Sequence, residues 1–223
     1  MIVAQLSDPH IVEPGKSPRT PAGFGPVDTA GFLSRAVDAL NRLDPLPDIA
    51  VITGDLVDRG EPAEYEHLRR LIAPLRMPVF VIPGNHDARA PLRAAFGADG
   101  YLAGDGFIQY AVDDYPLRLV ALDTLVAGKH HGELCADRLA WLDRALAAAP
   151  HRPTIVMMHH PPFMTGIAYM DKYGFDNPRA LAGIIVPYPT LAEVGKRAAM
   201  TYFIPGLSRP SVQRLIAWLR RFG

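Results

Sequence analysis

Four short segments of this 223-residue chain end an apolar run in residues that bind metal ions. Aspartate oxygens, asparagine carbonyls and imidazole nitrogens are hard or borderline ligands, which suit Mn, Fe or Zn better than a soft thiolate site would. Because the carboxyl ends of strands in an α/β sheet converge on one crevice, we expect the four segments to share one site. The segments are SDPH (7–10), TGDLVDRG (53–60), GNHD (84–87) and MHHPPF (158–163).

Each segment taken alone also has a purely structural explanation. Residues 8–10 can be a polar strand end, and residues 54–55 a turn. Residues 84–87 can be a turn followed by a helix cap at Asp87. The histidine pair 159–160 can be a satisfied pair at a strand end, or one ligand beside one residue of its outer shell. Their occurrence together, in this order on successive strands, favours a shared site.

The elements that must position these residues are apolar strands that alternate with helices. Runs that are apolar on both faces predict sheets covered on both sides. The stretch 107–122 predicts an antiparallel hairpin with a tight turn at 113–116. The Gly- and Pro-rich stretch 11–27 is expected to be an exposed loop. The expected strands are 2–6, 48–53, 78–82, 117–122 and 154–158, and the expected helices are 28–43, 62–74, 88–96 and 137–149.

Composition narrows the class of protein. The 23 basic and 23 acidic residues balance, so the bulk charge does not indicate a nucleic-acid polymer as partner. Cys135 is the single cysteine, which excludes an intramolecular disulfide and fits a reducing compartment. The chain starts directly with a strand pattern, without a signal-peptide pattern, and no apolar run approaches the ~20 residues of a membrane span. These features together predict a cytoplasmic protein.

The set DxH, GDxxDRG, GNHD and HHPP resembles, in order and spacing, the calcineurin-like metallophosphoesterase family. SDPH, EYEHLRRLI, VIPGNHD, AVDDYPLRLVALD and MHHPPF resemble its bacterial branch of class III cyclic-nucleotide and glycerophosphodiester phosphodiesterases. The resemblance covers about residues 1–185. It implies an α/β fold, the four-layer α/β/β/α sandwich of that family, and a phosphoesterase domain over 1–185.

The resemblance also implies a ligand set for two divalent metal ions (Fe, Mn or Zn). Asp8 and His10 would hold one ion, and Asn85 and His159 the other. Asp55 would bridge the two ions, because a carboxylate has two oxygens to share. Such a pair of ions clamps the attacking and leaving oxygens of an in-line displacement and supplies hydroxide at neutral pH.

Further roles follow from the same resemblance. His86 would be a catalytic residue beside the phosphate, and Asn85 and Arg59 would contact the substrate. His160 would lie in the outer shell of the metal site. The implied reaction is metal-dependent hydrolysis of a cyclic nucleotide or a small glycerophosphodiester. The implied partners are a small phosphodiester and, optionally, a second copy of the chain in a homodimer.

One family motif is absent. Gly-His-x-His, which supplies one histidine to each ion, has no counterpart, because no histidine follows His160. An alternative is therefore a catalytically impaired or inactive binding protein on the same scaffold, because the loss of one histidine from each ion is expected to weaken both metal sites. Residues 186–223 are expected to form a divergent helical appendage. Its basic amphipathic segment 208–223 favours packing on the domain or on a partner subunit over contact with a membrane.

Overall fold

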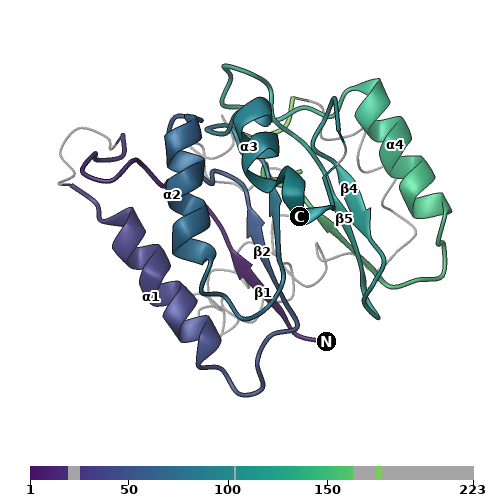
Figure 1. Ribbon diagram of the computed structural model, residues 1–223. Helices are drawn as coiled ribbons and strands as arrows, with labels where there is room; N and C mark the ends of the chain where they lie inside the picture. The colour runs from purple at the N-terminus through teal and green to yellow at the C-terminus, as the bar shows by residue number, and fades with distance from the viewer. Residues whose placement is uncertain (20–25, 103, 163–173, 177–223) are drawn as a thin grey trace, which may run out of the picture. The chain divides into compact units, whose positions relative to one another are not determined.

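The computed structural model describes residues 1–19, 26–102, 104–162 and 174–176, and its elements alternate between strands and helices (Figure 1). The predicted helical appendage and its boundary near residue 185 lie outside the described residues. No helix in the described part of the chain is long and apolar enough to cross a membrane. The elements are β1 (Val3–Leu6), α1 (Thr29–Asn41), β2 (Ile49–Thr53), α2 (Pro62–Ile72), β3 (Val79–Ile82), α3 (Arg89–Phe96), the 3-10 helix η1 (Gly97–Asp99), β4 (Tyr110–Val112), β5 (Arg118–Ala121), α4 (Ala136–Ala147) and β6 (Thr154–Met157).

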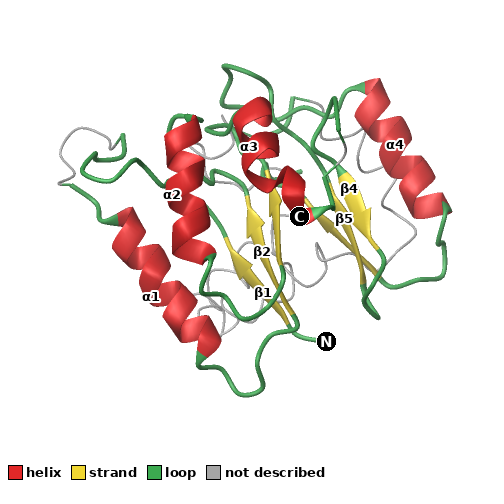
Figure 2. Cartoon of the chain, in the orientation of Figure 1, coloured by secondary structure: helices red, strands yellow, loops and turns green. Residues whose placement is uncertain are grey.

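The strands form two three-stranded sheets (Figure 2). In the first sheet, β1, β2 and β3 lie side by side and parallel. In the second sheet, β4 pairs antiparallel with β5 and β5 pairs parallel with β6. The expected strands, the hairpin and the four expected helices are thus confirmed to within a few residues at each end.

Two apolar clusters hold the layers together. Ile52 of β2 faces α1 and α2, and it packs in one cluster with Leu33 and Leu68. Val51, the preceding residue, faces the second sheet and packs in another cluster with Leu119 of β5. Successive side chains of a strand point to opposite faces, so β2 is buried on both sides. Figure 1 shows α4 on the side of β4 and β5 away from the first sheet, which gives the layer order helix, sheet, sheet, helix.

Helix starts follow local capping chemistry. The Asp28 carboxylate accepts a hydrogen bond of 2.8 Å from the Gly31 backbone N–H, as expected for the N-cap of α1. The helix α3 differs from expectation: it begins at Arg89 with Ala88 as its N-cap, so Asp87 is not a cap. Asp87 lies deeper, with its carboxylate buried beneath the loop.

The buried Asp87 carboxylate ties three segments together. It accepts hydrogen bonds from the backbone N–H of Gly84 at 2.8 Å and of Leu56 at 3.1 Å. The Tyr65 hydroxyl of α2 donates a third at 2.9 Å. Burial raises the pKa of Asp87 to about 7, against the effect of these donors. The loop after β3 is therefore fixed from below to the loop after β2.

The stretch 11–27 is only partly the exposed loop that was expected. Ile11 and Val12 are buried, with 0% and 5% of their surface exposed. The Ile11 N–H donates to the Leu56 carbonyl at 3.1 Å, and the Asp58 N–H donates to the Ile11 carbonyl at 3.1 Å. The chain after β1 therefore runs alongside the chain after β2 and shares its core, which a Gly and Pro count cannot reveal.

A buried ion pair joins the second sheet to α3. The Asp123 carboxylate, fully buried after β5, accepts from Arg89 Nε at 2.6 Å and from Arg89 Nη2 at 2.9 Å. The Ile108 N–H donates to it at 2.8 Å, and Arg138 of α4 donates to the Asp123 carbonyl at 3.0 Å. The centre of the Phe107 ring lies 5.2 Å from the Arg89 guanidinium carbon and 4.5 Å from that of Arg138.

We expect Asp123→Asn to lower the free energy of unfolding by about 3 kcal/mol, because it removes the fully buried counter-charge of the Arg89 guanidinium, whose side chain is 24% exposed. The matched control is Asp99→Asn, which removes an ion pair of the same 2.6 Å length from the exposed side chain of Arg69. That pair should be worth less than about 1 kcal/mol. Urea denaturation measures both, and equal losses would contradict the buried-pair argument.

Candidate functional site

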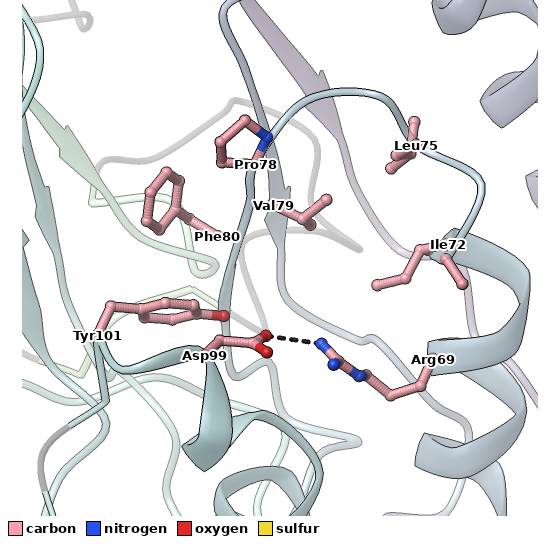
Figure 3. Close-up of a pocket in the computed structure, with 9 residues that line it drawn as sticks. Arg69, Ile72, Leu75, Pro78, Val79, Phe80, Asp99 and Tyr101 are labelled. Atoms are coloured by element: carbon pink, nitrogen blue, oxygen red, sulfur yellow. Dashed lines mark hydrogen bonds and ion pairs between the residues drawn. The ribbon is translucent and has the colours of Figure 1, made fainter.

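The cavity shown in Figure 3, of about 470 Å³, lies at the amino end of β3, near Val79 and Phe80. Its two charged lining residues, Arg69 and Asp99, pair with each other at 2.6 Å, as the dashed line shows. The polar residues identified from the sequence follow the carboxyl ends of the strands instead. The candidate site therefore lies at the other end of β3.

Backbone hydrogen bonds bring the first two strand ends together. The Asp8 N–H donates to the Gly54 carbonyl at 3.1 Å, and the His10 N–H donates to the Asp55 carbonyl at 3.0 Å. The side chains that follow β1 and β2 thus lie within reach of each other without any contribution from a long loop.

Asp55 stands at the centre of the site, with 6% of its side chain exposed. Its Oδ1 accepts a hydrogen bond from the His86 backbone N–H at 2.9 Å and lies 3.5 Å from His159 Nε2. Its Oδ2 lies 3.5 Å from His10 Nε2. One carboxylate therefore presents an oxygen to an imidazole on each side, one from the first sheet and one from the second.

Two groups of side chains in the described residues have ligand atoms within 4.8 Å of one another. Asp8, Asp55 and His159 form one group. The other group contains His10 of the predicted ligand set together with Asp58 and His86. His10 Nε2 nevertheless lies 4.0 Å from Asp8 Oδ1 and 3.5 Å from Asp55 Oδ2, so the two groups adjoin.

Asp58 is a residue that the sequence reasoning missed. Its Oδ1 lies 3.8 Å from His10 Nδ1 and 4.0 Å from His86 Nδ1, and its side chain is 1% exposed. The available signal was its place three residues after Asp55 in GDxxDRG. That segment ends a strand and turns sharply, so two carboxylates three residues apart can face one site.

Hydrogen bonds set the orientation of two imidazoles. A carbonyl only accepts, so His159 Nδ1–H donates to the Thr53 carbonyl at 2.9 Å and turns Nε2 toward Asp55. In the same way, His86 Nδ1–H donates to the Asp58 carbonyl at 2.8 Å. Anchoring one imidazole nitrogen to a carbonyl is the usual support of a metal-ligating histidine. The donor set of carboxylates and oriented imidazoles fits divalent ions of the Mn, Fe or Zn type.

The backbone at the site is strained. Asp8, His10 and Asp55 have φ angles of 55°, 42° and 48°, in the left-handed region that non-glycine residues seldom occupy. Each such residue costs on the order of 1–3 kcal/mol, which the surrounding hydrogen bonds must offset. All three belong to the predicted ligand set. Strained backbone residues cluster at binding sites, so their conformation agrees with that prediction.

Burial lowers the pKa of His10 below its usual value, and the neighbouring Asp55 carboxylate opposes that shift. His10 is therefore neutral near pH 7 and keeps a lone pair. A neutral imidazole is the form that binds a metal ion.

Arg59 and Asn85, both predicted to contact substrate, lie at the margin of the site. The Arg59 guanidinium donates to the Ser17 carbonyl at 3.3 Å and lies 3.6 Å from Asp58 Oδ2. Asn85 Nδ2 lies 3.5 Å from Nδ1 of His130, a histidine that sequence reasoning did not select. The available signal was that His130 belongs to GKHHG, in the loop that follows the end of β5.

His160 faces away from the carboxylates. Its Nε2–H donates to the His130 carbonyl at 3.1 Å, and its Nδ1 accepts from the Thr124 hydroxyl at 2.8 Å. Burial, followed by the neighbouring His159, lowers the pKa of His160 to about 4. His160 is thus a neutral imidazole with both nitrogens engaged outside the ligand groups.

A family model and curated proteins both match most of this chain. The family model of the calcineurin-like phosphoesterases matches residues 1–188. A glycerophosphodiester phosphodiesterase of Enterobacter lignolyticus is 34% identical over 87% of this chain and 69% of its own length. A probable cyclic nucleotide phosphodiesterase of Rhodopseudomonas palustris is 40% identical over 78% of this chain and 62% of its own length.

The fold has a counterpart among solved structures. The crystal structure of a dimetal phosphatase from Danio rerio superposes with a TM-score of 0.64 at 16% identity, over 82% of this chain and 76% of that chain. At this identity the likeness concerns the fold alone. The chain spans about three fifths to two thirds of the length of the curated relatives just described.

Gly54→Ala should disturb the site directly. A Cβ at Gly54 would lie 2.5 Å from His159 Nδ1, and the position has a φ of +92°. We expect a lower midpoint of thermal unfolding and weaker Mn²⁺ binding, by about tenfold or more, measured by calorimetry.

The matched control for this variant is Gly100→Ala, which has a φ of +83° and open space around the added Cβ. It carries the same backbone strain of about 1–3 kcal/mol without the collision. Equal loss of Mn²⁺ affinity in both variants would show that the approach of Gly54 to His159 is not what matters.

Proposed function

The chain belongs to the calcineurin-like phosphoesterase family, and from that premise we propose that it is a metal-dependent phosphodiesterase. The observation that carries the proposal is the buried Asp55 carboxylate between two imidazoles, with His10 Nε2 and His159 Nε2 each 3.5 Å from one of its oxygens. A carboxylate in that position is suited to hold two cations at once.

In this proposal Asp8 and His10 bind one divalent ion, Asn85 and His159 bind the other, and Asp55 bridges them. Support for the bridging role comes from His10 Nε2 and His159 Nε2, each 3.5 Å from a different oxygen of Asp55. The two groups of converging ligand atoms divide the set differently, with Asp8 beside Asp55 and His159, and His10 beside Asp58 and His86. The ions would supply hydroxide at neutral pH and positive charge beside the phosphate. The identity of the ions is open among Fe, Mn and Zn, because all three accept this donor set.

The other residues of the site bind and orient the substrate. His86 is the catalytic residue of this proposal. Its Nδ1–H donates to the Asp58 carbonyl, so its Nε2 is the nitrogen that would contact the phosphate. Arg59 adds positive charge at the margin, where it neutralises Asp58 in part. Asn85 offers an amide that can serve the ion through oxygen and the substrate through nitrogen.

The proposed substrate class is a cyclic nucleotide or a small glycerophosphodiester. Relatives that are 34% and 40% identical carry these two activities in their names. An anionic diester would be attracted by the metal charge and by Arg59. The proposed domain, residues 1–185, carries every one of the residues to which these roles are given.

A second candidate is a phosphate-binding protein on the same scaffold that does not turn over its ligand. The absence of any histidine after His160 favours it, because the family's Gly-His-x-His ligands then have no counterpart in this sequence. Metal stoichiometry discriminates the two candidates: two tightly bound ions per chain support the enzyme, and one or none supports the binding protein.

Asp55→Asn should abolish tight binding of Mn²⁺ and lower hydrolysis of bis(p-nitrophenyl) phosphate by at least about 100-fold, because it removes the bridging charge. The measurements are metal content after dialysis and release of p-nitrophenolate. The matched control is Asp38→Asn on the exposed side of α1, which should change neither. An active Asp55→Asn variant, or a fully metal-loaded wild-type protein without turnover, would contradict the enzyme proposal.

A further inference from the structure

We propose that His130 contacts the phosphodiester in the site described above, as a substrate-binding residue that does not bind metal. This inference rests on the proposed function and names one further residue of the same site. His130 is exposed at the mouth of the site, in the loop between β5 and α4.

The position of His130 places it beside both residues that follow β3. Its Nδ1 lies 3.5 Å from Asn85 Nδ2, at the long limit of a hydrogen bond. Its ring centroid lies 6.2 Å from that of His86, and the two rings are tilted by 54°. The second sheet thus contributes an imidazole to the side of the site where His86 is proposed to contact phosphate.

His130 is held by its backbone. Its carbonyl accepts from His160 Nε2–H at 3.1 Å, and His160 is itself bound to Thr124 at the end of β5. The base of the loop is closed by the Glu133 N–H, which donates to the Thr124 carbonyl at 3.1 Å. Thr124 and Glu133 thus close the base of the loop, and His160 holds its middle through the His130 carbonyl.

Gly132 shows how tightly this loop packs. A Cβ at Gly132 would lie 2.4 Å from His160 Cγ, so a side chain there would push the imidazole away. On its other side, the Gly132 N–H donates to the Gly174 carbonyl at 3.0 Å, and its carbonyl accepts from the Asp176 N–H at 3.1 Å. These contacts on both sides of Gly132 give His130 a defined place.

The donors around His130 favour substrate over metal. His130 belongs to neither group of ligand atoms that converge within 4.8 Å in the described residues. When Asn85 donates its amide N–H to His130 Nδ1, it keeps its carbonyl oxygen for an ion. An imidazole beside Asn85 and His86 suits an anionic phosphoryl oxygen, because imidazole N–H groups donate hydrogen bonds to anions.

The test uses the full chain loaded with Mn²⁺ and compares His130→Ala with the control His131→Ala. His131 is the adjacent imidazole, and its Nε2 pairs with Asp176 Oδ2 at 3.1 Å instead of facing the site. Three quantities are measured: Mn²⁺ stoichiometry, the dissociation constant of inorganic phosphate, and KM and kcat for bis(p-nitrophenyl) phosphate.

For His130→Ala we expect phosphate affinity to fall about tenfold, the usual effect of losing one hydrogen bond to an anion, with Mn²⁺ stoichiometry unchanged. The KM should rise by a similar factor. His130→Gln, which keeps an N–H donor of similar reach, should recover part of the loss, and His131→Ala should stay within about twofold of wild type.

Three results would overturn the inference: unchanged phosphate affinity in His130→Ala, loss of bound Mn²⁺ in that variant, or wild-type protein that binds Mn²⁺ but no phosphate. Turnover separates the two proposals. A protein that binds phosphate through His130 without hydrolysing the diester keeps this inference and loses the enzyme proposal. An active protein indifferent to His130→Ala keeps the enzyme proposal and loses this inference.

Discussion

The site depends on one buried negative charge. Asp55 lies at the end of β2, with 6% of its side chain exposed, and its neighbours are the His86 N–H and two imidazoles at 3.5 Å. A carboxylate removed from water is costly unless cations or donors compensate it. The segments that follow β1, β3 and β6 surround this group, and each supplies such a partner. The fold thus surrounds one buried carboxylate with a backbone N–H donor and two imidazoles.

Much of this arrangement could be predicted from the sequence. Apolar runs of four to six residues between amphipathic stretches gave the strands and helices to within a few residues, because burial on two faces leaves an unmistakable pattern. The convergence of Asp8 and Asp55 follows from the rule that parallel strands of one sheet end at one edge. His159 follows β6 of the second sheet, which that rule does not cover.

Other features depend on contacts that no local pattern encodes. The burial of Ile11 comes from its pairing with the chain after β2, whereas its Gly- and Pro-rich neighbourhood suggested an exposed loop. Asp87 has the residue type of a helix cap, yet the Tyr65 hydroxyl and two backbone N–H groups draw it inside. His130 lies 29 residues before His159, and only the packing of β5 against β6 brings its loop to the site.

The histidine pair illustrates how one dipeptide can serve two purposes. Adjacent side chains at the end of a strand point to opposite sides, and the rings of His159 and His160 meet edge to face, 4.9 Å apart at 85°. His159 is anchored to Thr53 of the first sheet and faces Asp55. His160 is anchored to Thr124, which follows β5 of the second sheet, and supports the loop of His130. The pair thus links the end of β6 both to β2 and to the loop of His130, next to Asp55.

The anchoring of that loop has an evolutionary consequence. Its fixed points are Thr124, His130 and Gly132, whereas residues 127–129 are exposed at its tip. Lengthening a flexible tip costs only about 0.6 kcal/mol for each doubling of its length. Insertions at 127–129 can therefore reshape the rim that surrounds a bound molecule while the anchors stay in place. Such insertions would leave Thr124, His130 and Gly132 where their hydrogen bonds hold them.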